Sequence, residues 1–256
     1  MKLNYTDQGS GNPIFLIHGL FGSLSNLGNL ARALVPSFRV VCVDLRNHGD
    51  SPHDGQMSLL SMAADIVELM DDLSIAHAFF AGHSLGGKVA MQLAMTSPDR
   101  VRSLVVADIA PVKYRDNNTI LINALQELSK ININNRKAAD LFLSEQGIEL
   151  SIRAFLLKNL RRNAQGNFDI KINIEAIKAN YEDHLSTAPQ GQNFTGPCLF
   201  LKGENSDYIQ QQYLPVINSL FPHSSVKTIE SAGHWLHAEK PELFNQLVLQ
   251  FISENS

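Results

Sequence analysis

The sequence predicts an α/β fold with a mostly parallel sheet flanked by helices. Short apolar runs alternate along the chain with segments that carry apolar residues at the three-to-four-residue spacing of a helix. Strand and helix patterns that alternate in this way are typical of parallel sheets covered by helices on both faces. The chain has 256 residues, which is long enough for one large domain with a well-buried core.

The predicted strands are short and almost wholly apolar, as expected for strands that are covered on both faces. They span residues 14–17, 40–43, 78–81, 104–107, 199–201 and 226–229. The predicted sheet-covering helices are amphipathic, and each carries apolar residues near i, i+3, i+4 and i+7. They span residues 26–35, 60–73, 87–95 and 241–252.

The alternation stops after Pro111 and resumes near Pro197. Helical stripes persist between them, at 120–130 and 150–160, and a structureless loop of that length is implausible in a compact domain. We therefore expect a core domain made of residues 1–111 and 193–256. Residues 112–192 are expected to form a helical cap over one end of the sheet.

Composition excludes several classes of function. The net charge of −4, without a basic stripe, argues against a nucleic-acid partner. The start of the chain has no apolar leader, and no window is long and apolar enough to span a bilayer, so no membrane association and a cytoplasmic location are expected. Cys42 and Cys198 lie in apolar runs, which predicts buried, reduced thiols that offer no metal framework.

The stretch "FFAGHSLGGKVAM", residues 79–91, fits two chemistries. Residues 82–86 fit G-x-S-x-G, a sharp strand-to-helix turn that presents a serine nucleophile at the end of a sheet. Residues 82–88 also fit the start of the phosphate-binding pattern G-x-x-x-x-G-K-[ST]. That pattern needs a Ser or Thr next, to hold magnesium, and the chain has Val89. The serine interpretation with Ser84 is favoured, and we expect no nucleotide, metal or other cofactor.

Two further motifs supply what a serine nucleophile needs. In "PIFLIHGLFGS" a backbone N–H after His18-Gly19, that of Leu20, can point at a developing oxyanion. The N–H of Leu85, the residue after the nucleophile, is the second expected donor. In "SAGHWLHAEKPE" His234 follows the last predicted strand, as the chain order Ser, acid, His requires for a general base.

The chain carries the motifs "HGLFGS", "DLRNHGDSP", "GHSLGGKVAM", "VVADIAPV" and "AGHW.HAEKP". Through these motifs together, the sequence resembles proteins of the α/β-hydrolase fold along nearly the whole chain. Small bacterial esterases of the YbfF type are the most similar subgroup. The resemblance implies the α/β-hydrolase fold, with a helical cap inserted after strand six of that fold. It also implies hydrolysis of esters with small to medium acyl chains. The cap carries no motif that identifies the substrate.

The acid of a Ser-His-acid triad has two candidates. Asp108 ends the apolar run "LVVAD", and Asp207 follows the run "LFLKGENSD"; either carboxylate could orient the imidazole of His234. The resemblance favours Asp108, whereas "GENSD" is similar to the acid loop of other branches of the fold. His18 and His83 are expected to have structural roles. His234 and His237 lack a third ligand for a metal.

The leading hypothesis is a serine hydrolase that acts on small carboxylic esters or acyl thioesters, as a monomer or small homo-oligomer. A carbon–carbon hydrolase or a lyase, as in relatives of the menaquinone pathway, is the alternative, and a non-catalytic binding module is a third. A lyase of that kind needs cations for its acidic substrate. Cap residues that could supply them are Arg115, Arg153, Arg161 and Arg162. Cap residues that could shape an acyl pocket are Phe142, Phe155, Leu156 and Leu157, although such stripes also serve helix packing.

Overall fold

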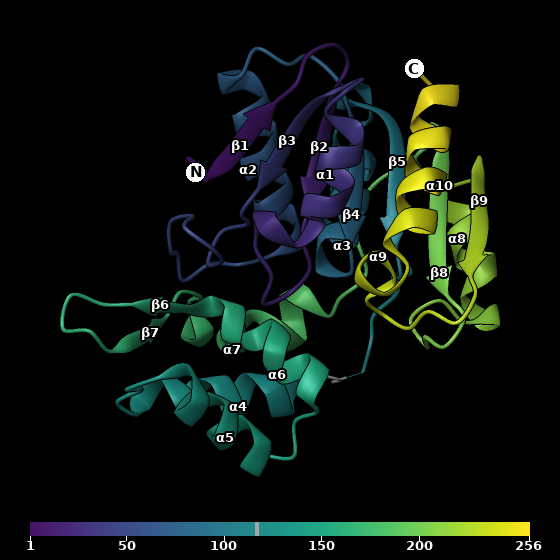
Figure 1. Cartoon of the computed structure of the whole chain (residues 1–256). Coiled ribbons are helices and arrows are strands. Elements are labelled where there is room, and N and C mark those ends of the chain that lie inside the picture. Colours follow the sequence, from purple (N-terminus) through teal and green to yellow (C-terminus); the bar gives the residue numbers. More distant parts are fainter. Residues whose placement is uncertain (116–117) are drawn as a thin grey trace.

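The computed structural model describes residues 1–115 and 118–256; residues 116–117, inside the predicted cap, lie outside the described part. A seven-stranded sheet with the order β1-β3-β2-β4-β5-β8-β9 forms the centre (Figure 1). All neighbouring strands are parallel except β1 and β3. The predicted mostly parallel sheet is confirmed. The strands are β1 (Tyr5–Gln8), β2 (Pro13–Ile17), β3 (Arg39–Val43), β4 (Ala78–His83), β5 (Val101–Ala107), β8 (Cys198–Gly203) and β9 (Ser224–Ile229).

All six apolar runs that predict strands lie within strands of this sheet. The antiparallel edge strand β1 was not predicted, because its four residues, YTDQ, are all exposed and form no apolar run. Counted along this chain, the inserted segment follows β5, because one strand, β1, precedes β2.

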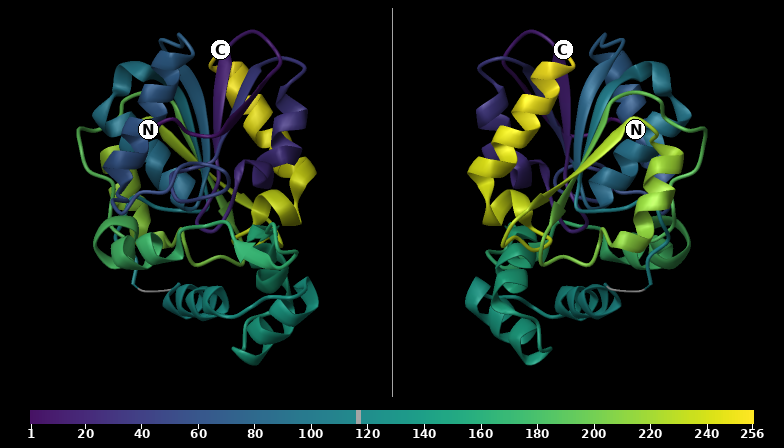
Figure 2. Two further views of the ribbon diagram at one scale, coloured as in Figure 1. Left: turned by 90° about the vertical axis from the view of Figure 1, so that its left-hand side faces the viewer. Right: turned by 90° about the vertical axis from the view of Figure 1, so that its right-hand side faces the viewer.

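Helices cover both faces of the sheet (Figure 2). One apolar cluster joins α1 and α10 to side chains such as Ile14 and Leu16 of β2. The other joins α2, α3 and α8 to the alternate side chains Phe15 and Ile17, as the two-residue period of a strand requires. The helices of this part are α1 (Gly28–Leu34), α2 (Leu59–Asp72), α3 (Leu85–Thr96), α8 (Leu214–Leu220), α9 (Leu236–Glu239) and α10 (Pro241–Glu254), with the short turns η1 (Leu24–Leu27), η2 (Pro98–Arg100) and η5 (Gln211–Tyr213).

The segment between β5 and β8 packs against the edge at which the parallel strands end, below the sheet in Figure 1. It is not wholly helical, because β6 and β7 pair as an antiparallel hairpin. The side chain of Asn159 holds this segment to the loop after β2, because it donates to the carbonyl of Phe21 (2.8 Å). The elements are α4 (Thr119–Lys130), α5 (Arg136–Glu145), α6 (Leu150–Leu156), η3 (Leu157–Asn159), β6 (Leu160–Arg162), β7 (Phe168–Ile170), α7 (Ile174–Asn180) and η4 (Tyr181–Leu185).

Both cysteines, Cys42 and Cys198, are buried and free, as predicted. Among the described helices, none is both long and apolar enough to cross a membrane.

Candidate active site

Ser84 lies in a tight turn between β4 and α3. Its φ of 52° and ψ of −118° are sparsely populated for a residue with a side chain, so the surroundings must enforce them. The N–H of Ser84 donates to the carbonyl of Ala107 in β5 (2.9 Å). A Cβ at Gly82 would lie 2.3 Å from the carbonyl oxygen of Gly86, and one at Gly86 would lie 2.2 Å from that of Ile17. The G-x-S-x-G stretch thus forms the sharp strand-to-helix turn that it predicts.

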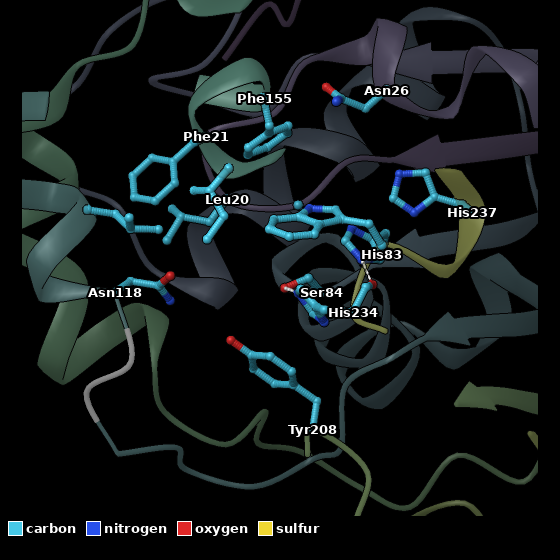
Figure 3. A pocket seen from close by; sticks show the side chains of 14 residues that line it. Leu20, Phe21, Asn26, His83, Ser84, Asn118, Phe155, Tyr208, His234 and His237 are labelled. Atoms are coloured by element: carbon cyan, nitrogen blue, oxygen red, sulfur yellow. Dashed lines mark hydrogen bonds between the residues drawn. The ribbon is translucent and has the colours of Figure 1, made fainter. Parts of the chain in front are cut away.

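Three side chains form one hydrogen-bonded line at the carboxyl edge of the sheet. The hydroxyl of Ser84 donates to Nε2 of His234 (3.0 Å), and Nδ1 of His234 donates to Oδ2 of Asp108 (2.8 Å). Figure 3 shows Ser84 and His234 side by side. In this geometry the imidazole can take the serine proton, and the carboxylate can hold the ring in the required tautomer.

Asp108 directly follows β5 and is completely buried. Its Oδ1 accepts from the N–H of Gly203 (2.9 Å), and its Oδ2 also accepts from the hydroxyl of Ser206. Together with His234, three donors therefore face this carboxylate. A buried carboxylate needs such donors, because an unpaired charge in the interior is very costly.

Asp207, the alternative acid, is exposed and lies four residues beyond the end of β8. None of the hydrogen bonds or ion pairs of His234 in the described structure involves it. Its two neighbours reach the site instead: Ser206 donates to Asp108, and the ring of Tyr208 stacks on the imidazole of His234 with centroids 4.1 Å apart. Neither role could be predicted from the sequence, because a lone hydroxyl or ring in a loop has no periodicity or motif.

The residues of the two predicted oxyanion donors lie beside Ser84: Leu20 lines two cavities that contain Ser84, and Leu85 lines the smaller of these. Nδ1 of His18 donates to the carbonyl of Gly19 (2.7 Å), and the N–H of Gly22 donates to the same oxygen (3.0 Å). Because a trans peptide holds its C=O and N–H on opposite sides, this fixes the direction of the Leu20 N–H. Leu85 is the first residue of α3, where a helix leaves its amides without internal partners. Both amides are therefore suited to receive an oxyanion.

His18 and His48 accept hydrogen bonds from backbone N–H groups and so hold the loop that carries Leu20 in place. Nε2 of His18 accepts from the N–H of Leu45 (3.1 Å), and Nε2 of His48 accepts from the N–H of Phe21 (3.1 Å). Burial lowers the pKa of His18 to about 4 and that of His48 to about 3. Both rings are therefore neutral at pH 7 and can accept these bonds. The structural role expected of His18 extends to His48.

His83 holds the loop that carries His234. Its Nε2 donates to the backbone carbonyl of His234 (2.8 Å), and its ring lies 4.4 Å from that of His237, centroid to centroid. Burial lowers the pKa of His83 well below its usual value and that of His237 to about 4. Within residues 1–115 and 118–256, no three His, Cys, Asp or Glu side chains converge as they would around a metal ion.

Lys88, on which the phosphate-loop interpretation depends, serves another contact. Its Nζ is buried and donates to the carbonyls of Ser186 (2.7 Å) and Thr187 (2.6 Å), where the inserted segment returns to the sheet. One turn further along α3, Gln92 exchanges two hydrogen bonds with the backbone of Gln190. Burial lowers the pKa of Lys88 to about 7. Helix α3 therefore carries Ser84 at its start and holds the returning segment along its length.

A cavity of about 220 Å³ opens above Ser84 (Figure 3). Of the four apolar cap residues considered from the sequence, Phe155 lines it, whereas Phe142, Leu156 and Leu157 pack in or against the apolar core. The four cap arginines are not among the residues that line it. Arg153 pairs with Asp140 (2.8 Å), and Arg161 lies near Asp50 (3.7 Å). The cation site that a lyase of acidic substrates needs is therefore not formed by these four side chains.

Comparison with known proteins gives a consistent result. A family model described as "alpha/beta hydrolase fold" matches residues 12–241. The curated esterase YbfF of Escherichia coli is 36% identical over 260 residues, covering 99% of this chain and 100% of the relative. The mouse sn-1-specific diacylglycerol lipase ABHD11 is 40% identical over 249 residues, which cover 94% of this chain and 80% of the relative.

Among solved structures, one titled "Marine microorganism esterase" superimposes with a TM-score of 0.93 at 39% identity, covering 98% of this chain and 99% of that chain. A succinate-derivative hydrolase, "E-2-(Acetamidomethylene)succinate Hydrolase", superimposes with a TM-score of 0.78 at 24% identity, which is a likeness of fold alone.

Proposed function

Since the chain belongs to the α/β-hydrolase family, we propose that it hydrolyses small carboxylic esters through an acyl-enzyme on Ser84. The observation that carries the proposal is the hydrogen-bonded line from Ser84 through His234 to the buried Asp108, which opens into a cavity. Relatives that are named esterases or lipases at 36–40% identity support ester hydrolysis.

In the acylation step, Oγ of Ser84 attacks the ester carbonyl carbon while Nε2 of His234 takes the hydroxyl proton. Asp108 stabilises the imidazolium that forms, and the backbone N–H groups of Leu20 and Leu85 donate to the oxyanion. When the carbon–oxygen bond to the alcohol breaks, His234 returns its proton to the leaving oxygen. The product of this step is an acyl-enzyme and a free alcohol.

In the deacylation step, His234 takes a proton from water, and the resulting hydroxide attacks the acyl carbon. The tetrahedral intermediate collapses, Ser84 is released with a proton from His234, and the carboxylic acid leaves. The same two steps release a thiol from an acyl thioester, so that thioesters are a second substrate class under this proposal.

Substitution of Ser84 tests the proposal directly. We expect Ser84→Ala to lower kcat for p-nitrophenyl butyrate by about 10⁴-fold or more, because it removes the covalent step. Ser103→Ala is the matched control: Ser103 is buried in β5, and its hydroxyl has no hydrogen-bond partner in the described structure, so its loss should leave kcat within a few-fold. A fluorophosphonate probe should modify Ser84 and no other serine. An adduct on a different serine, or more than a few per cent of the wild-type kcat in Ser84→Ala, contradicts the proposal.

A further inference from the structure

Two cavities meet at Ser84, and different groups border them. The larger one, of about 220 Å³, is lined by His234, Trp235 and His237. The smaller one, of about 40 Å³, is lined by Leu85, Lys88 and Leu185 but not by His234. Both contain Ser84, Leu20 and Tyr208, so a substrate held at the nucleophile reaches into both.

The chemistry of the leaving step distinguishes the two cavities. His234 must protonate the alcohol oxygen, so this oxygen has to lie within hydrogen-bond distance of Nε2. The alcohol portion of the ester then continues into the cavity that His234 lines. At the tetrahedral carbon, the remaining substituent after Oγ, the oxyanion and the alcohol oxygen is the acyl chain. The cavity at Ser84 that lacks His234 is left for it.

We propose that the small cavity binds the acyl chain and that the large cavity binds the alcohol, so that the preferred esters combine a short acyl group with a bulkier, mainly apolar alcohol. This inference rests on the proposed ester hydrolysis at Ser84. The small cavity, of about 40 Å³, has less than a fifth of the volume of the large one, of about 220 Å³. We therefore expect short acyl groups, such as acetyl to butyryl, to fit it better than long ones.

One wall of the small cavity is held in place by hydrogen bonds and close packing. Nζ of Lys88 is held by the carbonyls of Ser186 and Thr187, which directly follow η4. Leu185, the last residue of η4, is 3% exposed and supplies an apolar part of the same wall. A longer acyl chain would have to displace these groups, and well-packed interiors resist such overpacking.

The large cavity has a second cavity beside it. It shares Phe155, Trp235 and His237 with a neighbouring cavity of about 500 Å³ between α6 and the loop that carries His234. The rings of Phe155 and Trp235, with centroids 5.9 Å apart, are apolar, aromatic lining that the two cavities share. The large cavity itself has more than five times the volume of the small one, about 220 against 40 Å³, so the bulkier portion of the ester is expected on this side.

Two substrate series test the assignment. One varies the acyl chain from acetate to octanoate on p-nitrophenol, and the other varies the alcohol from ethyl to octyl and 1-naphthyl on acetate, with release of acid followed by a pH indicator. For the wild type, we expect kcat/KM to fall at least about tenfold between butyrate and octanoate. Along the alcohol series it should stay level or rise.

Substitutions in the two walls sharpen the test. Leu185→Ala should raise the octanoate-to-butyrate ratio by about tenfold and leave the octyl-to-ethyl acetate ratio unchanged. Phe155→Ala should change the alcohol ratio and leave the acyl ratio unchanged. Leu143→Ala is the matched control, because Leu143 is a fully buried leucine of α5 that lines neither cavity; both ratios should stay as in the wild type.

The outcomes separate this inference from the proposed function. Swapped effects of Leu185→Ala and Phe155→Ala, or a wild-type rate that is level through octanoate, overturn the acyl and alcohol assignment while ester hydrolysis stands. If the wild type hydrolyses neither series, the proposed function is wrong and the assignment with it. The wild-type profiles decide the matter even where a variant does not fold.

Discussion

Replacing Asp108 by asparagine changes one oxygen to an NH₂ group and leaves the shape of the side chain intact. In the native site Oδ1 accepts from the N–H of Gly203, and Oδ2 accepts from His234 and Ser206. An asparagine has one acceptor oxygen. The Gly203 amide is a fixed backbone donor, so the oxygen is expected to face it, which turns the NH₂ group toward Nδ1 of His234.

That orientation selects the wrong tautomer of His234. Nδ1 then accepts from the NH₂ group, the proton moves to Nε2, and Nε2 can no longer take the proton of Ser84. The flipped orientation would leave the buried Gly203 N–H without an acceptor, at about 1–3 kcal/mol. The negative charge that stabilises the imidazolium is lost in both cases. We expect kcat to fall about 10³–10⁴-fold, equivalent to about 4 to 5.5 kcal/mol.

The assay is the steady-state kcat for p-nitrophenyl butyrate, with Asp207→Asn as the matched control. Asp207 is exposed and forms no hydrogen bond or ion pair with His234 in the described structure, so its variant should lose less than about tenfold. The double variant shows whether the second aspartate takes over when the first is removed, because a shared role gives a non-additive loss. A severe Asp207→Asn loss beside a near-normal Asp108→Asn would refute the assignment of the acid.

Two further predictions concern stability. In the folded protein, the pKa is about 4 for His18 and His237 and about 3 for His48, below the unfolded value near 6.5. The unfolded chain therefore binds more protons below pH 6.5, and the free energy of unfolding should fall from pH 6.5 toward pH 4. Each histidine should cost roughly 2 kcal/mol at pH 5, and equal urea-unfolding free energies at pH 7.5 and pH 5 would contradict this. Lys88→Met should leave the carbonyl of Thr187 without its Lys88 donor and that of Ser186 with the N–H of Tyr114 alone. We expect it to lower the unfolding free energy by about 2 kcal/mol and to speed hydrogen exchange at 186–192 relative to the rest of the chain. Unchanged exchange in that segment would show that Lys88 does not hold it.

The parts of this molecule that could be predicted from the sequence are those with a local pattern. Apolar runs marked six of the seven strands of the main sheet, and the glycines of G-x-S-x-G marked the turn at Ser84, because a Cβ at either position meets a backbone oxygen. The exposed strand β1 and the β6–β7 hairpin carry no such pattern. Strand β1 pairs with β3, which is distant in sequence, and the two three-residue strands of the hairpin are too short and too little buried to form an apolar run.

The choice between Asp108 and Asp207 as the carboxylate partner of His234 could not be made from the sequence for a related reason. Asp108 and Asp207 have similar local surroundings in sequence, and only the chain's return after β8 decides which of them is buried beside His234. In the loop after β8, Asp207 is exposed, whereas its two sequence neighbours contact the site. Ser206 donates to Asp108, and the ring of Tyr208 stacks on that of His234. A hydroxyl that donates to a distant carboxylate leaves no trace in a single sequence.

The contacts along α3 have a consequence for exchanging lids between relatives. Lys88, Gln92 and the carbonyl of Met95 bind the backbone of the returning segment at successive turns, and the N–H of Tyr114, on the outgoing side, donates to the carbonyl of Ser186. These contacts fix the position of both ends of the inserted segment relative to α3, the helix that Ser84 precedes. A foreign lid inserted between residues 115 and 185 would keep these hydrogen bonds to α3. A splice that also removes residues 186–192 would lose them and leave the inserted lid without this attachment to the core.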